Sequence, residues 1–146
     1  MEIKDFLAPL HVVIDLRASD KKRLLEELAR RAAAAVGLGA ESIASALSKR
    51  EALGSTGTGG GVAVPHARLA GLGRPFGLLA RLTKPVDFDA IDGQPVDLVF
   101  LLLLPANADD KQLNALACAA RALRDAEVLR DLRRAGDAAE AYRALI

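Results

Sequence analysis

The chain has few aromatic residues and only one cysteine. Phe, Tyr and Trp make up 3% of its 146 residues, Trp is absent, and the single cysteine is Cys118. One cysteine cannot form an internal disulfide, and so few aromatic side chains argue against nucleic-acid binding through base stacking. The 20 basic and 19 acidic residues nearly balance, and no Lys/Arg block suited to a phosphate backbone stands out. We therefore expect no nucleic-acid partner.

Long hydrophobic runs and a leader sequence are also missing. The longest apolar stretch, Val96–Pro105, contains Asp97 and is far too short to cross a bilayer. The first residues, MEIKDFLAPLHVV, lack the basic segment and the apolar segment that mark a signal peptide. These absences predict a cytoplasmic protein with no membrane span.

The remaining composition is typical of a globular domain. Hydrophobic residues make up 51% and charged residues 27%, and a chain of this length can bury about two thirds of its unfolded surface. No internal repeat, low-complexity tail or long linker divides the chain. We expect one domain over residues 1–146 with a core of Leu, Val and Ala.

The N-terminal half predicts one strand and two helices. Glycines at positions 37 and 54 are placed to end the two helices. The second helix carries Ile43, Leu47 and a further apolar position on one face. The three elements are a strand over His11–Leu16, a helix from its cap Ser19 to Val36, and a helix from about Ala40 to Leu53.

The C-terminal half predicts three strands and then helices. The strands are Val62–Val64, Phe76–Leu82 and Val96–Leu104, and the last is so continuously apolar that it should be central in the sheet. Three helices are predicted after Asp109. The second covers about Glu127–Arg134, and the third is a short helix from the capping pair Asp137 and Glu140 to Ile146. The apolar stripe of the first consists of Leu113, Leu116, Ala117, Ala120 and Leu123. This order predicts an α/β domain with helices packed on a small sheet.

The most unusual stretch is GSTGTGGGVAVPHAR, residues 54–68, in which five of the first eight residues are glycine. A Walker A loop requires a lysine that is absent here, and a dinucleotide loop requires glycine at positions that valine occupies. Both nucleotide loops also leave a strand and open a helix, whereas this stretch is predicted to follow a helix and enter a strand. His11 and Cys118 give no close ligand pair with His66. No nucleotide, metal or other cofactor is therefore expected.

A lone histidine can still act as a nucleophile. His66 can attack an electrophile if one ring nitrogen is unprotonated and an acceptor holds the N–H of the other. Phosphate suits the surroundings best, because glycine amides and the hydroxyls of Ser55 and Thr56 can donate to phosphoryl oxygens. Arg50 and Arg68 can offset the added charge of about −2. On these residues alone, a surface histidine beside a turn is an equally good interpretation.

These stretches resemble a known family. GSTGTGGGVAVPHAR is similar to the active-site signature of IIA domains of the fructose/mannitol class in the bacterial phosphoenolpyruvate-dependent phosphotransferase system. KPVDFDAIDGQPVDLVFLLLLP resembles the nitrogen-regulatory IIA proteins in particular, and the similarity runs over nearly the whole chain. The resemblance implies a single IIA-type phosphocarrier domain whose mixed β-sheet of about four to five strands is sandwiched by helices.

The resemblance also implies that His66 accepts a phosphoryl group through Nε2 from a histidine-containing phosphocarrier protein. A second histidine, common in the family at the start of a later helix, is replaced here by Gln112. Gln112 can hydrogen-bond the phosphoryl group or His66 but cannot shuttle a proton. The residues of the matching motif that are implied to support the phosphohistidine are Arg50, Ser55, Thr56 and Arg68.

Three functions are compatible with the sequence. The stretch DFDAIDGQPVDLVF favours a regulatory phosphocarrier, whose phosphorylation state decides whether it binds a partner such as a potassium transporter, a sensor kinase or a metabolic enzyme. A second possibility is a transport IIA component that passes the phosphoryl group to a IIB protein. In both cases the protein is a phosphoryl carrier rather than a stand-alone metabolic enzyme. The third possibility is a non-catalytic module that binds a small anion.

Overall fold

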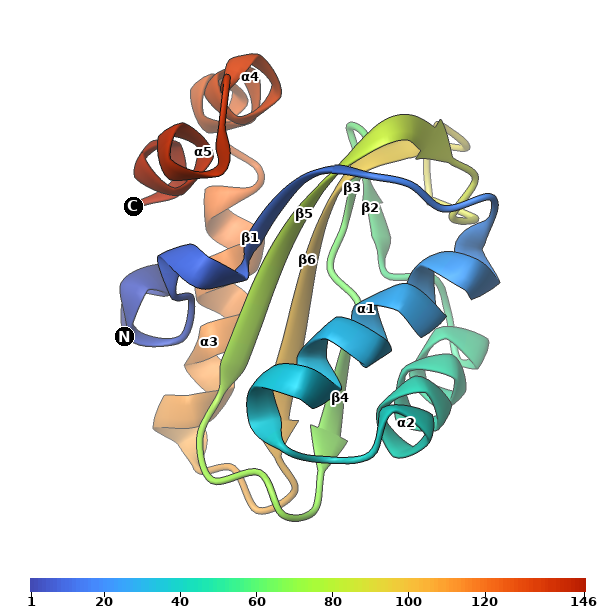
Figure 1. The fold of residues 1–146 in the computed structure, drawn as a ribbon, viewed down its shortest axis with the longest axis vertical. Helices are drawn as coiled ribbons and strands as arrows, with labels where there is room; N and C mark the ends of the chain where they lie inside the picture. Colours follow the sequence, from blue (N-terminus) through green and yellow to red (C-terminus); the bar gives the residue numbers. More distant parts are fainter.

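A mixed β-sheet of six strands lies between two groups of helices (Figure 1). The computed structural model describes residues 1–146. The strands are β1 Val12–Leu16, β2 Gly57–Gly59, β3 Val62–Ala63, β4 His66–Leu69, β5 Phe76–Val86 and β6 Val96–Pro105. The helices are α1 Lys21–Val36, α2 Ala40–Ala52, α3 Asp110–Ala122, α4 Ala126–Arg134 and α5 Ala138–Leu145. None of these helices is both long and apolar enough to span a membrane.

The sheet has the order β1-β5-β6-β3-β2, and β4 also pairs with β6. β5 and β6 are antiparallel, whereas β1 is parallel to β5, and both β3 and β4 are parallel to β6. β3 pairs with β6 at Leu98 and Val99, and β4 pairs with it over Leu102–Pro105. The two short strands therefore lie end to end along one side of β6. The predicted central position of β6 is confirmed.

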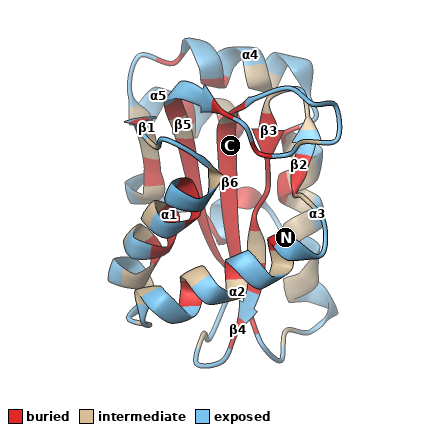
Figure 2. Cartoon of the chain, turned by 90° about the vertical axis from the view of Figure 1, so that its right-hand side faces the viewer, coloured by how far each residue is buried: buried red, intermediate tan, exposed pale blue.

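β6 contributes side chains to two hydrophobic cores, which explains its nearly continuous apolar sequence. Val99, Leu101 and Leu103 pack in the core that contains α1 and α2 residues, and the even-numbered residues from Leu98 to Leu104 pack with α3, α4 and α5. Figure 2 shows that β6 is buried between these layers. Because each buried leucine contributes about 1.5–3 kcal/mol relative to exposure, this strand is a major source of stability.

The helices confirm most of the predicted boundaries. The N-cap of α1 is Asp20, whose carboxylate accepts a first-turn backbone N–H at 2.8 Å, so the predicted Ser19 cap is wrong by one residue. Gly37, at φ 72°, ends α1 as predicted. On α3, Ala115 and Ala119 are fully buried, whereas Ala117, predicted to lie on the apolar stripe, is exposed. An alanine-rich helix offers several similar stripes, and packing on the sheet selects one.

The structure has six strands, one more than the four to five predicted. β2 and β4 are the two without a strand pattern in the sequence. β2 is Gly-Thr-Gly, and β4 is the four-residue segment His-Ala-Arg-Leu. Pairing with β3 and β6 defines them, rather than local preference. The omission of β4 matters because this strand carries His66.

Gly60 and Gly61 form the turn between β2 and β3. Their φ angles are 67° and 80°, a region that residues with side chains rarely adopt. The Gly60 N–H donates to Asp92 Oδ2 at 3.0 Å, and the Gly60 carbonyl accepts from Arg133 Nη2 at 2.6 Å. Arg133 also forms a two-pronged pair with Asp97, at 2.9 and 3.0 Å. Contacts from the β5–β6 connection, β6 and α4 therefore fix the glycine turn.

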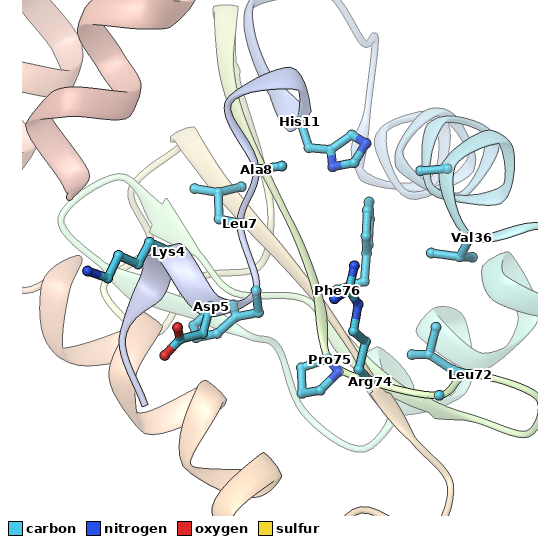
Figure 3. Close-up of a pocket in the computed structure, with 13 residues that line it drawn as sticks. Lys4, Asp5, Leu7, Ala8, His11, Val36, Leu72, Arg74, Pro75 and Phe76 are labelled. Carbon is cyan, nitrogen blue, oxygen red and sulfur yellow. The ribbon is translucent and has the colours of Figure 1, made fainter.

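The N-terminal segment forms two single-turn helices, η1 Ile3–Asp5 and η2 Pro9–His11, beside a cavity of about 390 Å³. Figure 3 shows the His11 ring next to Phe76 at this cavity. The two rings meet edge to face with their centroids 4.8 Å apart. Burial lowers the pKa of His11 from its ordinary value of 6.5. His11 thus has a packing role at the start of β1.

We predict that Gly61→Ala destabilises the protein more than Gly60→Ala does. Both variants place alanine at positive φ, which costs about 1 kcal/mol. A Cβ on Gly61 would also lie 2.6 Å from Arg133 Nη2 and 2.8 Å from Asp97 Oδ1, whereas a Cβ on Gly60 meets nothing within 4 Å. Urea denaturation should show a loss of about 1 kcal/mol for Gly60→Ala and about 2–3 kcal/mol for Gly61→Ala. Equal losses would contradict the role given to the Asp97–Arg133 pair.

A second prediction concerns the pH dependence of stability. Because the pKa of His11 is lowered in the folded state, the unfolded chain binds the proton more tightly. The contribution of His11 to the free energy of unfolding is therefore full above pH 6.5 and is lost as the pH falls below that value. His11→Phe keeps the ring contact without the titration. Urea denaturation between about pH 5 and about pH 8 should give a shallower pH slope for the variant, and an unchanged slope would contradict the assignment.

Candidate functional site

The position of His66 follows from the pairing of β4 with β6. His66 is the first residue of β4, and its partner across the ladder is Leu102. Ala67 and Leu69 are buried in the core with α1 and α2. Because successive side chains of a strand alternate, His66 and Arg68 share the other face of β4, with their Cα atoms about 7 Å apart. His66 is half-buried and Arg68 is exposed.

Hydrogen bonds fix the tautomer of the His66 ring. Nδ1 lies 2.9 Å from the carbonyl oxygen of Val64, which can only accept, so Nδ1 carries the hydrogen. Nε2 therefore has a free lone pair, and it accepts from Arg50 Nε at 3.3 Å. This is the arrangement that a nucleophilic imidazole requires: one nitrogen anchored as a donor and the other available to attack.

Arg50 connects the histidine to the end of α2. It lies in the last turn of this helix, and its Nη1 donates to the Gly54 carbonyl at 2.8 Å while its Nε donates to His66. A guanidinium is always charged in proteins and offers five donors in a rigid plane. Of the predicted supporting residues, Arg50 is the one that the structure brings into direct contact with His66.

The hydroxyls of Ser55 and Thr56 are engaged elsewhere. Ser55 Oγ donates to the Phe88 carbonyl at 2.6 Å and accepts the Gly57 N–H at 3.0 Å. Thr56 is buried, and its hydroxyl and its N–H both donate to the carboxylate of Glu51. Both hydroxyls therefore stabilise the loop before β2. Neither hydroxyl hydrogen is free to meet a phosphoryl group in this structure.

The glycine turn lies away from His66. Val62, directly after the turn, pairs with Leu98, whereas His66 pairs with Leu102. Four residues along a strand correspond to about 13 Å. The Gly60 N–H donates to a carboxylate, as described above, and the Gly57 N–H donates to Ser55 Oγ. Contrary to expectation, these two amides do not face His66, because that of Gly60 is bonded to the β5–β6 connection and that of Gly57 to the loop before β2.

Gln112 lies in the first turn of α3 and takes part in its cap. Its side-chain carbonyl accepts the Asp109 N–H at 3.1 Å, and its own backbone N–H donates to Asp109 Oδ1 at 2.8 Å. This reciprocal pair is a capping box. No hydrogen bond joins Gln112 to His66, so the structure does not bring these two predicted site residues into contact.

Glu51, a buried carboxylate at the end of α2, was not predicted from the sequence. It is 9% exposed and lies on the same buried helix face as Ile43 and Leu47. Besides Thr56, it contacts Lys21 Nζ at 3.0 Å. The sequence does contain a signal for it, because a carboxylate stands four residues after Leu47 in a helix stripe that is otherwise apolar. Such a pattern predicts a buried acid with a partner.

The site can therefore present one unprotonated imidazole nitrogen beside a fixed positive charge. No group of three or more His, Cys, Asp or Glu side chains is placed to hold a metal ion. The cavity in Figure 3 is lined by residues 4–8, 11, 35–36 and 72–76 and does not include His66. His66 thus lies at a half-buried position on a strand rather than in that cavity.

Comparison with known proteins gives a consistent result over the full chain. Residues 5–146 match the family model described as "Phosphoenolpyruvate-dependent sugar phosphotransferase system, EIIA 2". A "Nitrogen regulatory protein" of Bradyrhizobium diazoefficiens is 46% identical over 145 residues, covering 99% of this chain and 95% of the relative. The crystal structure of nitrogen regulatory protein IIA-Ntr from Neisseria meningitidis superposes with a TM-score of 0.92 at 38% identity, covering 99% of both chains.

A more distant structure supports the same fold. IIA mannitol from Escherichia coli superposes with a TM-score of 0.76 at 18% identity, covering 95% of this chain and 98% of the other. The mannitol IIA-like fold predicted from the resemblance is confirmed, as is the similarity to nitrogen-regulatory IIA proteins, and together they support a phosphoryl-carrier role. The chain belongs to the EIIA 2 family of the phosphoenolpyruvate-dependent sugar phosphotransferase system.

Proposed function

We propose that His66 accepts a phosphoryl group on Nε2 from a histidine-containing phosphocarrier protein and that its phosphorylation state regulates partner proteins. The observation that carries this proposal is the hydrogen bond from Nδ1 to the Val64 carbonyl, at 2.9 Å. It keeps the hydrogen on Nδ1 and leaves Nε2 as the nucleophile. Similarity to nitrogen-regulatory proteins supports the regulatory part.

The transfer step is a displacement at phosphorus. The Nε2 lone pair forms a new N–P bond, the N–P bond of the donor phosphohistidine breaks, and its electron pair returns to the donor ring. Nδ1 of His66 keeps its hydrogen on the Val64 carbonyl throughout. Arg50 must leave Nε2 for the attack, and its remaining donors then reach the phosphoryl oxygens.

Three donors can stabilise the transferred group, which adds about two negative charges. Arg50 already lies at Nε2, and the exposed Arg68 shares the face of β4 with His66. Among the N–H groups of residues 54–57, that of Ser55 is the one without an acceptor inside the chain. We therefore assign the Ser55 amide, rather than its hydroxyl, as a donor to the phosphoryl group. Thr56 supports the site through the loop, whereas the contacts of Gln112 are those of the α3 cap.

Phosphorylation changes the charge of a half-exposed surface, which suits a regulatory switch. About two negative charges replace a neutral imidazole beside Arg50 and Arg68. A partner that docks on the positive surface is then disfavoured, and one that binds a phosphoryl group is favoured. We propose that the regulated partners are of the potassium-transporter or sensor-kinase class, in keeping with the nitrogen-regulatory relatives.

The His66 assignment predicts that His66→Ala abolishes phosphorylation. The protein is incubated with phosphoenolpyruvate, the upstream phosphotransferase and the histidine phosphocarrier, and acid-labile, base-stable phosphate is measured. We expect wild type to be labelled stoichiometrically and His66→Ala not at all, because the nucleophile is missing. His11→Phe is the matched control, since it removes the other histidine and should be labelled normally. A labelled His66→Ala protein would overturn the assignment.

The same assay separates the alternative functions. An unlabelled wild-type protein would favour a non-catalytic anion-binding module. Onward transfer to a IIB protein and then to sugar would favour a transport component. The fold is shared with enzyme IIAMTL from Escherichia coli, whose structure was determined in complex with phosphorylated enzyme IIBMTL. Stable phosphorylation without onward transfer supports the regulatory role.

A further inference from the structure

Glu51 lies at the centre of a buried hydrogen-bonded network. Its carboxylate accepts the Thr56 N–H, at 3.1 and 3.3 Å from its two oxygens, and the Thr56 hydroxyl. It also pairs with Lys21 Nζ at 3.0 Å. The Glu51 side chain is only 5% exposed and that of Lys21 only 20%. Lys21 has a second, exposed partner in Asp89 at 3.7 Å. Removing Lys21 would leave the buried Glu51 carboxylate without its counter-charge, which is strongly unfavourable.

Lys21 extends this network to the connection between β5 and β6. Its Nζ donates to the Phe88 carbonyl at 3.3 Å and lies 4.6 Å from the centroid of the Phe88 ring. The same carbonyl accepts the Ser55 hydroxyl at 2.6 Å. Residues 54–57 are therefore held from two sides, by Glu51 through Thr56 and by Phe88 through Ser55. Lys21, at the start of α1, bridges the two sides.

The network adjoins the phosphoryl-acceptor site through the chain itself. Glu51 directly follows Arg50 in the last turn of α2, and successive helical side chains project about 100° apart. Glu51 therefore enters the network while Arg50 reaches His66. Arg50 also depends on the loop that Glu51 holds, because its Nη1 donates to the Gly54 carbonyl at 2.8 Å. Any movement of residues 54–57 therefore moves the Gly54 carbonyl that holds the Arg50 guanidinium.

We propose that Glu51, paired with Lys21, is a positioning residue for phosphoryl acceptance. This inference rests on the proposed function of His66. Glu51 does not touch the reacting atoms. It orders residues 54–57, and this order keeps Arg50 on Gly54 and His66.

The charge of Glu51 is essential to this role. Glutamine has the same size and retains one acceptor oxygen for the Thr56 N–H, so Glu51→Gln should fold. Its amide cannot accept from the Thr56 N–H, the Thr56 hydroxyl and Lys21 together, and it leaves the Lys21 charge without its closest partner. The loop and Arg50 then sample other positions. Misplacement of a positioning group by about 1 Å can lower a rate by up to about a hundredfold.

The experiment compares initial rates of phosphoryl acceptance from the phosphocarrier for wild type, Glu51→Gln, Arg50→Gln and the double variant. We expect Glu51→Gln to be about tenfold slower than wild type and Arg50→Gln to be slower still. The double variant should be no slower than Arg50→Gln alone, because Glu51 acts through Arg50. Glu41→Gln is the matched control, since it makes the same change at an exposed position of α2 and should leave the rate unchanged.

A second readout needs no phosphoryl transfer. The NMR signal of the Arg50 Nε–H in the unphosphorylated protein reports its bond to His66. Glu51→Gln should move this signal toward that of a solvent-exposed arginine, whereas Glu41→Gln should not. Melting curves verify that each variant is folded at the assay temperature. Loss of stability alone would not produce a rate effect that disappears in the Arg50→Gln background.

Three results would each overturn the positioning role. They are a Glu51→Gln rate within about twofold of wild type, a double variant slowed by the product of the two single effects, and an Arg50 signal that Glu51→Gln leaves unchanged. If wild type accepts no phosphoryl group at all, the proposed function of His66 fails instead. The Arg50 signal then still decides whether Glu51 positions the arginine.

Discussion

The hydrogen bond between the Val64 carbonyl and His66 Nδ1 lies at the break between two short strands. β3 and β4 both pair with β6, but Val64 and Pro65 lie between them, and Pro65 has no N–H to give to a ladder. The Leu102 N–H donates to the Pro65 carbonyl at 3.0 Å, so the strand stays in register across the break. The Val64 carbonyl is thereby left to accept from the ring two residues later, at 2.9 Å. The Val64 N–H donates to the Thr56 carbonyl, on the side that faces away from β6, so the Val64 carbonyl takes no part in the pairing with β6.

The other side-chain contact of the His66 ring comes from Arg50 at the end of α2. Arg50 connects the ring to the Gly54 carbonyl, and the loop that begins there is tied to Glu51 and Phe88. His66 is therefore held by the pairing of β4 with β6, while Arg50 is held by a helix and by a loop that a buried ion pair ties down. In the proposed transfer, this division would let the guanidinium move from Nε2 to a phosphoryl oxygen without disturbing the strand that orients the ring.

Local sequence patterns predicted the elements that are determined by their own residues, through backbone conformation or through a strongly hydrophobic run. The apolar run of β6 predicted a central strand, and Gly37 predicted the end of α1, because burial and backbone conformation are encoded within a few residues. The glycine turn could not be interpreted correctly in this way. Its conformation depends on Asp92, Asp97 and Arg133, which are distant in sequence, so its glycines suggested an anion loop. β4 and the partners of Glu51 were missed for the same reason: tertiary pairing defines them.

The tautomer of His66 also bears on Gln112, which stands where the family resemblance implies a second histidine. Nδ1 keeps its hydrogen on the Val64 carbonyl, so in the proposed reaction Nε2 has no proton to lose. A displacement at phosphorus from one imidazole to another therefore needs no general base near the acceptor. What the step does need is positive charge and N–H donors, which Arg50 and Arg68 can supply. A residue that cannot titrate, such as Gln112, is compatible with this chemistry, and its use as the capping partner of Asp109 shows that the position has a structural task of its own.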